Sequence, residues 1–240
     1  MIDQTGASAT DTAFLEWLEG WEQKLKDESL SKLLQEATGP DAVGVFCVDV
    51  TNGFCHEGPL SNPRVKKIVR PIADLFQICY QAGIRNFILP QDQHPEDSPE
   101  FSSWPIHCVA GSSEAETVPE LMKLPFSRLF QIIPKQSISS DLETSLGDYL
   151  DTRILDVAIC VGDCTDLCLY QLAMYLRLRA NARGDAFTVI VPSECVDTYD
   201  LPLKSAEVVG ALPHPGDLMH RLFLYHLALN GVRIVRNIHA

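Results

Sequence analysis

The stretch ILDVAICVGDCTDLCLYQLAMYLRLRANARG, from Ile154 to Gly184, decides the predicted fold. Its first part, 154–162, is an almost continuous apolar run, typical of a strand that is buried on both faces of a sheet. The part that follows, 165–184, places apolar residues at helical spacing and ends at a glycine, a common helix terminator. The stretch therefore predicts a strand, a tight turn and a helix, which is the repeating unit of a parallel α/β sheet.

The same alternation of strands and helices runs through most of the chain. Further strands are predicted at 42–49, 85–90, 128–135, 187–192 and 232–237, and further helices at 62–83, 141–153 and 214–231. Strands joined by helices form right-handed crossovers in one sheet. We therefore expect a Rossmann-like, doubly wound α/β fold whose mostly parallel, six-stranded sheet has helices on both faces. Pro71 is expected to kink the helix at 62–83.

The residues before the first strand have a different pattern. Between Asp11 and Leu34, apolar residues recur at helical spacing with charged residues between them, which predicts an amphipathic helix or a pair of helices. We therefore divide the chain into an N-terminal helical extension, 1–40, and an α/β domain, 41–240. The extension could cover a sheet edge or form the interface of a homo-oligomer, and composition does not choose between the two.

The composition excludes several classes of partner. The chain has 240 residues, of which 46% are hydrophobic, and its formal net charge is −13. Nucleic acids and anionic membranes require basic patches, so we expect neither as a partner. The first residues lack the basic and apolar regions of a secretory signal, so we expect no leader, and no apolar run reaches the roughly 20 residues of a membrane span. We expect a cytoplasmic protein whose eight cysteines are thiols rather than a disulfide framework.

Polar residues follow the carboxyl ends of four predicted strands. Asp49 ends the first strand and Lys135 ends the third, whereas Asp92 and His94 follow the second, and Cys164 and Cys168 follow the fourth. In an open parallel sheet these strand ends lie along one edge, which is where ligands bind. The sequence therefore predicts a single functional site at that edge.

Cys168 is the first candidate for a nucleophile. We expect Thr165 or Asp166 to cap the next helix and to leave Cys168 in its first turn, where the helix dipole and free N–H groups lower the pKa of a thiol. The same N–H groups can hold an oxyanion. Three alternatives stay open: Cys168 is a buried structural thiol, Cys164 is the nucleophile, or both cysteines bind a structural metal.

Asp49 and Lys135 are the predicted partners of the thiol. A carboxylate at the end of an apolar strand is expensive to bury unpaired, and Lys135 ends a strand in an equivalent place. The two residues could form a structural ion pair only. Beside a thiol, Asp49 can take the thiol's proton and pass it to a leaving amine, while Lys135 orients the carboxylate and stabilises negative charge.

The loop after the second strand carries potential metal ligands. It reads QDQHPEDSPEFSSWPIHC, from Gln91 to Cys108, and contains Asp92, His94 and His107. One carboxylate and two imidazoles suit Zn²⁺, or Fe²⁺ and Mn²⁺, with positions left for water or substrate. The alternative is that the two histidines are solvated and that the aspartate caps a helix.

These motifs together resemble those of the nicotinamidases of the isochorismatase-like cysteine hydrolase superfamily. VDVTNGFCHEGPL (48–60) resembles the family's opening motif, DQHPEDSPEFSSWPIHCVAGSSEAE (92–116) its metal loop, and VGDCTDLCLYQLA (161–173) its nucleophile turn. The resemblance spans roughly 43–199, and the later segment 199–235 is similar to the plant-type branch. Three ordered motifs in their expected strand context are specific, whereas one motif alone would not be.

The resemblance implies a role for each candidate residue. The family's catalytic triad corresponds to Asp49, Lys135 and Cys168, and its metal ligands correspond to Asp92, His94 and His107. The aromatic residues that sandwich the substrate ring correspond to Phe54 and Trp104. The oxyanion hole corresponds to the N–H groups of Cys164 and Cys168. The peptide bond between Asp163 and Cys164 matches one that is cis in the family. By the same resemblance, residues 41–240 form an isochorismatase-like hydrolase domain.

The implied activity is metal-dependent hydrolysis of nicotinamide to nicotinate and ammonia, through a cysteine thioester, in NAD salvage. One divalent ion would position the ring, with zinc expected first and iron or manganese as alternatives. The main alternative is a related cysteine amidohydrolase that acts on another small amide. A vinyl-ether hydrolase would not use the cysteine, and a catalytically silent binding module would not need the whole triad.

Some positions depart from the family's pattern. Residues 95–98 stand where many members have a further histidine, so we expect fewer protein ligands on the metal. Thr51 and Gly53 replace the usual Gln and Asp, and Asp163 replaces an apolar residue. A carboxylate beside a thiol opposes its ionisation, so we expect Asp163 to point away from the thiol.

Three histidines fall within the predicted helix at 214–231. They are His214, His220 and His226. Since no matching cluster of ligands lies near them in the sequence, we interpret them as surface and packing residues.

Overall fold

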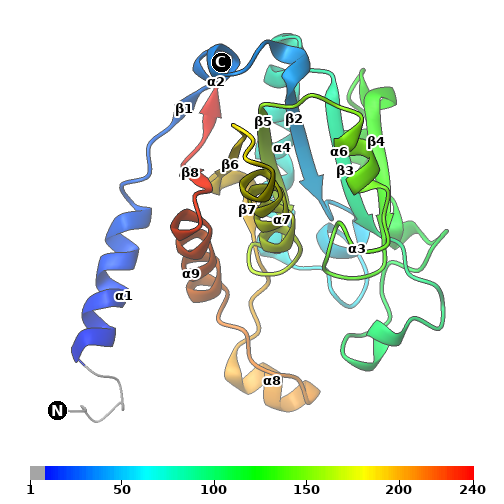
Figure 1. Cartoon of the computed structure of the whole chain (residues 1–240). Helices are drawn as coiled ribbons and strands as arrows, with labels where there is room; N and C mark the ends of the chain where they lie inside the picture. Colours follow the sequence, from blue (N-terminus) through cyan, green and yellow to red (C-terminus); the bar gives the residue numbers. More distant parts are fainter. Residues whose placement is uncertain (1–8) are drawn as a thin grey trace.

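The computed structural model describes residues 9–240 and contains a seven-stranded sheet with helices on both faces (Figure 1). The strands are β2 (Val43–Val48), β3 (Asn86–Asp92), β4 (Phe130–Lys135), β5 (Val157–Asp163), β6 (Thr188–Pro192), β7 (Val196–Asp197) and β8 (Arg233–Val235). Their order is β4-β3-β2-β5-β6-β8, with β7 pairing with β5 off this path. All these described ladders are parallel. The six longer strands are those that the sequence predicts, in the order typical of a Rossmann fold.

The two faces of the sheet are covered by different helices. Because side chains alternate along a strand, Val45 and Cys47 of β2 pack in the cluster on the side of α4 (Pro63–Gln81). Phe46 and Val48 pack in the cluster on the side of α6 (Leu146–Asp151), α7 (Cys168–Arg183) and α9 (Gly216–Leu229). Every residue of β2 is buried, as the continuous apolar run predicts.

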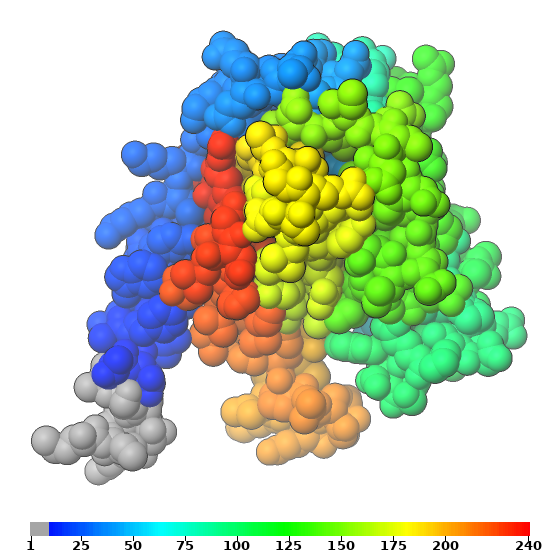
Figure 2. All heavy atoms as spheres, viewed as in Figure 1, coloured from blue at the N-terminus to red at the C-terminus, as the bar shows by residue number. Residues whose placement is uncertain are grey.

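Several shorter helices connect these elements. They are α3 (Asn52–Cys55), α5 (Pro119–Met122), α8 (Leu203–Val209), and the 3-10 turns η1 (Pro40–Ala42), η2 (Pro99–Ser102), η3 (Ser113–Ala115), η4 (Ser127–Leu129) and η5 (Ser193–Cys195). The α8 segment protrudes from the end of the molecule towards which the strands run (Figures 1 and 2). Pro71 lies inside α4, which is one uninterrupted helix. Within residues 9–240, no helix has both the length and the apolar composition that crossing a membrane requires.

The described part of the N-terminal extension contains two helices, α1 (Ala9–Glu22) and α2 (Leu30–Glu36). Residues 1–8 of the predicted extension lie outside the described residues. A two-residue strand, β1 (Glu28–Ser29), precedes α2 and pairs in parallel with β9 (Ile238–His239), which the sequence does not predict. Three rings of α1 pack around the ring of Tyr225 on α9: Phe14, Trp17 and Trp21.

The turn before α7 differs from the prediction. The residue before the helix is Leu167, and no side chain caps the first turn, so the expectation that Thr165 or Asp166 caps α7 is wrong. Both side chains bond to histidines from a later segment instead: Thr165 to His220 and Asp166 to His214. Cys168 is the first residue of α7, as expected.

Candidate active site

Four strand ends bring the predicted catalytic residues together. Asp92 and Lys135 end β3 and β4 and are partners in the ladder between these strands. Asp49 follows β2 with a positive φ of 56°, and the backbone N–H of Asp92 donates a 2.9 Å hydrogen bond to Asp49 Oδ1. Cys168 enters from the turn after β5. The adjacent ends of β4, β3, β2 and β5 thus place these side chains in one cluster.

Lys135 joins the members of this cluster. Its Nζ lies 2.6 Å from Asp49 Oδ2, 2.6 Å from Asp92 Oδ1 and 3.5 Å from Cys168 Sγ. The lysine is only 1% exposed, and the other three side chains are also buried. The predicted triad of Asp49, Lys135 and Cys168 is therefore assembled within hydrogen-bond reach.

The electrostatics of the cluster favour a carboxyl group that can carry a proton. Burial, and then repulsion from Asp92, raise the pKa of Asp49 to about 6. Burial alone would lower the pKa of Lys135, but the two carboxylates raise it well above its usual value, so the lysine is charged. A carboxyl group that titrates near neutral pH suits a general base that later acts as an acid.

The pKa of the Cys168 thiol differs in direction from the one that its position at the start of a helix predicts. Burial raises the pKa of Cys168 well above its ordinary value, although the charge of Lys135 acts in the opposite direction. The expectation of a lowered pKa is therefore wrong for this site, because desolvation outweighs the helix terminus. A buried neutral thiol needs a base within reach to remove its proton, and Asp49 is the candidate for that base.

The turn between β5 and α7 presents two unused backbone donors. The carbonyl of Cys164 accepts hydrogen bonds from the N–H groups of Leu167 (3.0 Å) and Leu169 (3.1 Å). Within residues 9–240, the N–H groups of Cys164 and Cys168 have no backbone acceptor. The peptide bond between Asp163 and Cys164 is cis, as the resemblance implies. Two free N–H groups beside a thiol can bind an oxyanion.

Asp92, His94 and His107 form a second cluster that touches the first. Their ligand atoms lie within 4.8 Å of one another, with Asp92 Oδ2 3.6 Å from His94 Nε2 and 3.7 Å from His107 Nε2. His94 is 0% exposed, and neither of its ring nitrogens has a hydrogen-bond partner among the described residues. Buried polar atoms are rarely left without partners, so a divalent cation fits these residues. The alternative of two solvated loop histidines is excluded, because both are buried.

Two residues that the sequence analysis missed adjoin this cluster. Glu100 Oε2 lies 4.0 Å from His94 Nδ1, and the ring of Phe101 packs against the rings of His94 and His107 at 5.4 and 5.7 Å. The carbonyl of Pro105 lies 2.8 Å from His107 Nδ1, which directs Nε2 towards Asp92. The sequence signal for Glu100 is that it is a carboxylate within the loop from Gln91 to Cys108. The turn η2, which brings it close to His94, is too short to predict.

The two predicted substrate-binding aromatics occupy different places. The half-buried ring of Phe54, on α3, lies 5.7 Å from the ring of His107 and so adjoins the metal cluster. The half-buried ring of Trp104 lies edge-on to the ring of Tyr199 at 6.3 Å. Phe54 and Trp104 are not in ring contact with each other within the described residues.

Asp163 is buried beside the turn. It is 1% exposed, and its Oδ2 contacts the Sγ atom of Cys164 at 3.7 Å. Burial, and then the charge of Asp49, raise the pKa of Asp163 well above its ordinary value.

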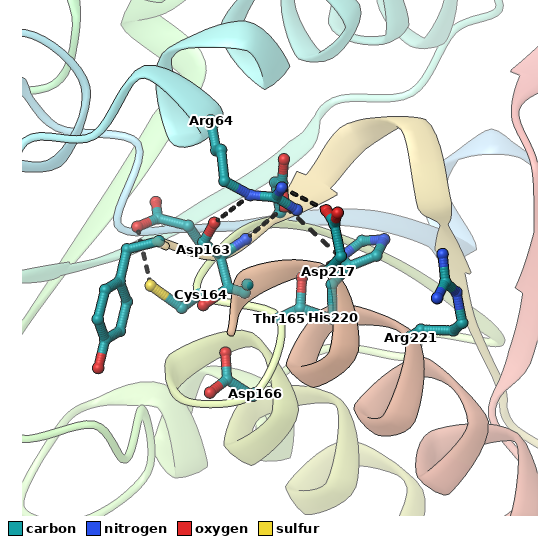
Figure 3. Close-up of polar contacts among 12 residues, drawn as sticks. Arg64, Asp163, Cys164, Thr165, Asp166, Asp217, His220 and Arg221 are labelled. Atoms are coloured by element: carbon teal, nitrogen blue, oxygen red, sulfur yellow. Dashed lines mark hydrogen bonds and ion pairs between the residues drawn. The ribbon is translucent and has the colours of Figure 1, made fainter. Parts of the chain in front are cut away.

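His214 and His220 bond to side chains of the turn between β5 and α7. Figure 3 shows His220 beside Thr165 of this turn. His214 precedes α9 and is only 7% exposed, and its ring stacks on Tyr199 at 3.8 Å. His214 Nε2 lies 2.8 Å from Asp166 Oδ2. These two histidines are packing residues, in agreement with the interpretation of the three histidines as surface and packing residues. His226 is exposed, as predicted.

Comparisons with known proteins agree with this arrangement. A model of the isochorismatase domain matches residues 43–214. Nicotinamidase 1 from Arabidopsis thaliana is 31% identical in an alignment of 218 positions, which covers 82% of this chain and 86% of that protein.

Solved structures share the fold at lower sequence identity. A pyrazinamidase of Pyrococcus horikoshii in complex with zinc has a TM-score of 0.63 and 22% identity, covering 81% of this chain and 99% of that one. An N-carbamoylsarcosine amidase from Thermoplasma acidophilum has a TM-score of 0.60 and 21% identity, covering 81% and 95%.

Proposed function

The chain belongs to the isochorismatase family, and from this membership and the geometry of its site we propose that it is a nicotinamidase. It would hydrolyse the carboxamide of nicotinamide to nicotinate and ammonia. The similarity to the Arabidopsis nicotinamidase over most of the chain supports this proposal. The observation that carries it is the position of Lys135 Nζ, in contact with both Asp49 and the Cys168 thiol.

The first half of the proposed reaction forms a thioester. Asp49 takes the proton of Cys168, and the thiolate attacks the carboxamide carbon. The N–H groups of Cys164 and Cys168 hold the oxyanion that forms, and Lys135 keeps the carboxylate of Asp49 aligned. When the oxyanion collapses, the C–N bond breaks, and Asp49 returns its proton to the leaving nitrogen as ammonia.

The second half releases the acid. Asp49, again ionised, takes a proton from water, and the hydroxide attacks the thioester carbon. The same two N–H groups hold the second oxyanion. The C–S bond then breaks, nicotinate leaves, and the proton on Asp49 returns to the sulfur, so that the site is restored.

We propose that Asp92, His94 and His107 hold one divalent cation, zinc in the first place and iron or manganese as alternatives. When bound, such an ion would supply a Lewis acid that helps to orient the substrate ring. Phe54 and Trp104 would enclose the ring. The product nicotinate would serve NAD salvage.

The direct test is the release of ammonia from nicotinamide by the purified protein, with and without a chelator, beside the variant Cys168→Ala. We expect activity that chelation reduces and the variant lacks. If zinc-loaded protein released no ammonia from nicotinamide, the nicotinamidase proposal would be wrong. Release from a panel of other small amides would then support the alternative, a related cysteine amidohydrolase.

A further inference from the structure

The turn that carries the proposed oxyanion hole is held from behind at Thr165. This threonine lies between Cys164 and Cys168 in sequence and is fully buried. Its backbone N–H donates to the carbonyl of Asp197 at 3.0 Å, and its Oγ1 lies 2.8 Å from Nδ1 of His220 (Figure 3). One residue of the turn is thus fixed both through its backbone and through its side chain.

The imidazole of His220 comes from outside the matched domain. His220 lies on α9, beyond residues 43–214, and its ring nitrogens approach Glu22 of α1 at 3.7 Å and Asp197 at 3.8 Å. Besides burial, the positive charges of Arg64 and Arg221 also lower the pKa of the ring. Burial lowers the pKa of His220, so its ring is neutral and Nδ1 can accept the hydrogen of the Thr165 hydroxyl.

The ring of His220 is not fixed by close packing alone. It borders a cavity of about 400 Å³ that is also lined by Glu22, Arg64 and Asp197. With space on one side, the ring depends on its polar contacts for its position. The Thr165 hydroxyl is the partner within hydrogen-bond distance of Nδ1, so the position of the ring and that of the turn are coupled.

We propose that His220 is a positioning residue for the nucleophile turn, which it holds through Thr165. The inference rests on the proposed function, because it assumes that the turn supplies the oxyanion hole. Donors to an oxyanion must lie about 2.7–3.1 Å from the developing charge, so a small displacement of the turn weakens stabilisation of the transition state. Binding of the substrate ring depends on other residues and is left unchanged. The rate of the chemical step therefore depends on His220 more than substrate affinity does.

The variants separate this contact from a general effect on packing. His220→Gln removes the polar atom near Nδ1, whereas His220→Asn keeps one there. Thr165→Val removes the hydroxyl at nearly constant shape, and Thr165→Ser keeps it. The matched control is His226→Gln, because His226 Nδ1 makes the same kind of bond, 3.0 Å from the hydroxyl of Tyr170, between α9 and α7 on the exposed side.

We expect His220→Gln and Thr165→Val each to lower kcat about tenfold, the effect of losing one buried hydrogen bond in the transition state, with KM changed less than about twofold. The double variant should lose no more than either single variant, because both remove the same contact. His220→Asn and Thr165→Ser should recover most of the rate, and His226→Gln should match the wild type. Independent losses that multiply in the double variant would overturn the proposal.

A second measurement does not depend on the substrate. The rate at which iodoacetamide alkylates Cys168, located by peptide mass spectrometry, reports how well the turn stabilises the thiolate. We expect slower alkylation in His220→Gln and Thr165→Val at an unchanged melting temperature. Wild-type alkylation rates in both variants would overturn the positioning role. Slower alkylation in a protein that does not hydrolyse nicotinamide would support positioning while refuting the nicotinamidase proposal.

Discussion

Asp92 joins the two clusters of the site to each other through Lys135: its Oδ1 lies 2.6 Å from Lys135 Nζ, while its Oδ2 faces both histidines of the metal cluster. Burial alone would raise the pKa of Asp92, but the lysine and the imidazoles lower it, so the carboxylate is ionised. Its charge in turn raises the pKa of Asp49. A single carboxylate thus links the protonation of the proposed base to the cation site.

Replacing Lys135 with methionine should destabilise the protein as well as inactivate it. The change leaves Asp49 and Asp92 buried without their cation, which lowers the free energy of unfolding by about 3 kcal/mol or more. Chemical denaturation followed by circular dichroism measures the loss. Lys32→Met is the control, because its ion pair with Glu28 is exposed and should contribute less than about 1 kcal/mol. Equal losses of unfolding free energy in the two variants would show that Lys135 does not stabilise the fold through its buried carboxylate partners.

The two cysteines of the turn should respond differently to replacement. Cys168→Ala removes the nucleophile and should reduce the rate of nicotinamide hydrolysis by about 10³-fold or more. Cys164→Ala keeps the backbone N–H, so it should stay within about threefold of the wild type, as expected for a group that acts through its main chain. Steady-state ammonia release measures both. The opposite ranking would make Cys164 the nucleophile.

The pair formed by His214 and Asp166 should stabilise the fold in a limited range of pH. Burial opposes both charges, but their attraction prevails, so the pKa of His214 is raised and the pKa of Asp166 is lowered. The contribution of the histidine is complete below its ordinary pKa of about 6.5 and is lost as pH rises through the raised value. The contribution of the aspartate is present above about pH 4 and is lost as pH falls through the lowered value.

His214→Gln should therefore lower the melting temperature more at pH 5.5 than at pH 9. Calorimetry of the wild type and the variant at both values measures this difference. His56→Gln is the control, because the pair of His56 with Glu120 is partly exposed and should contribute little at either pH. A loss of the same size at pH 5.5 and pH 9 would show that His214 acts through packing alone.

Removal of His94 should abolish the proposed metal site without unfolding the protein. We expect dialysed wild-type protein to retain one zinc ion per chain, measured by atomic emission spectroscopy. His94→Ala should lower the affinity by about 100-fold or more, because one of three protein ligands is missing. His56→Ala, which changes a histidine outside the cluster, should keep the full metal content. Equal zinc content in both variants would place the ion elsewhere.

The strands and the site edge were predictable because both depend on local pattern and on topology. The strands β2, β5 and β6 are apolar runs of five to seven residues, and the carboxyl ends of parallel strands must share an edge. The strands β1, β7 and β9 have two residues each, so they have no pattern of their own and exist through their partners.

What the sequence analysis missed depends on contacts between distant segments. Thr165 and Asp166 have the composition of helix caps, but His220 and His214, 55 and 48 residues later, satisfy their side chains instead. The pKa of Cys168 was predicted from the helix terminus alone. Burial raises this pKa instead, and burial depends on the whole fold.

The pairing of β1 with β9 can form only near the end of biosynthesis. Residues 28–29 leave the ribosome early, but residues 238–239, their partners in the ladder, are made about two hundred residues later. At about 5–20 residues per second, the wait is on the order of ten to forty seconds. During that time the two residues of β1 lack their partners in the ladder, so this edge of the fold is completed only when residues 238–239 have been made.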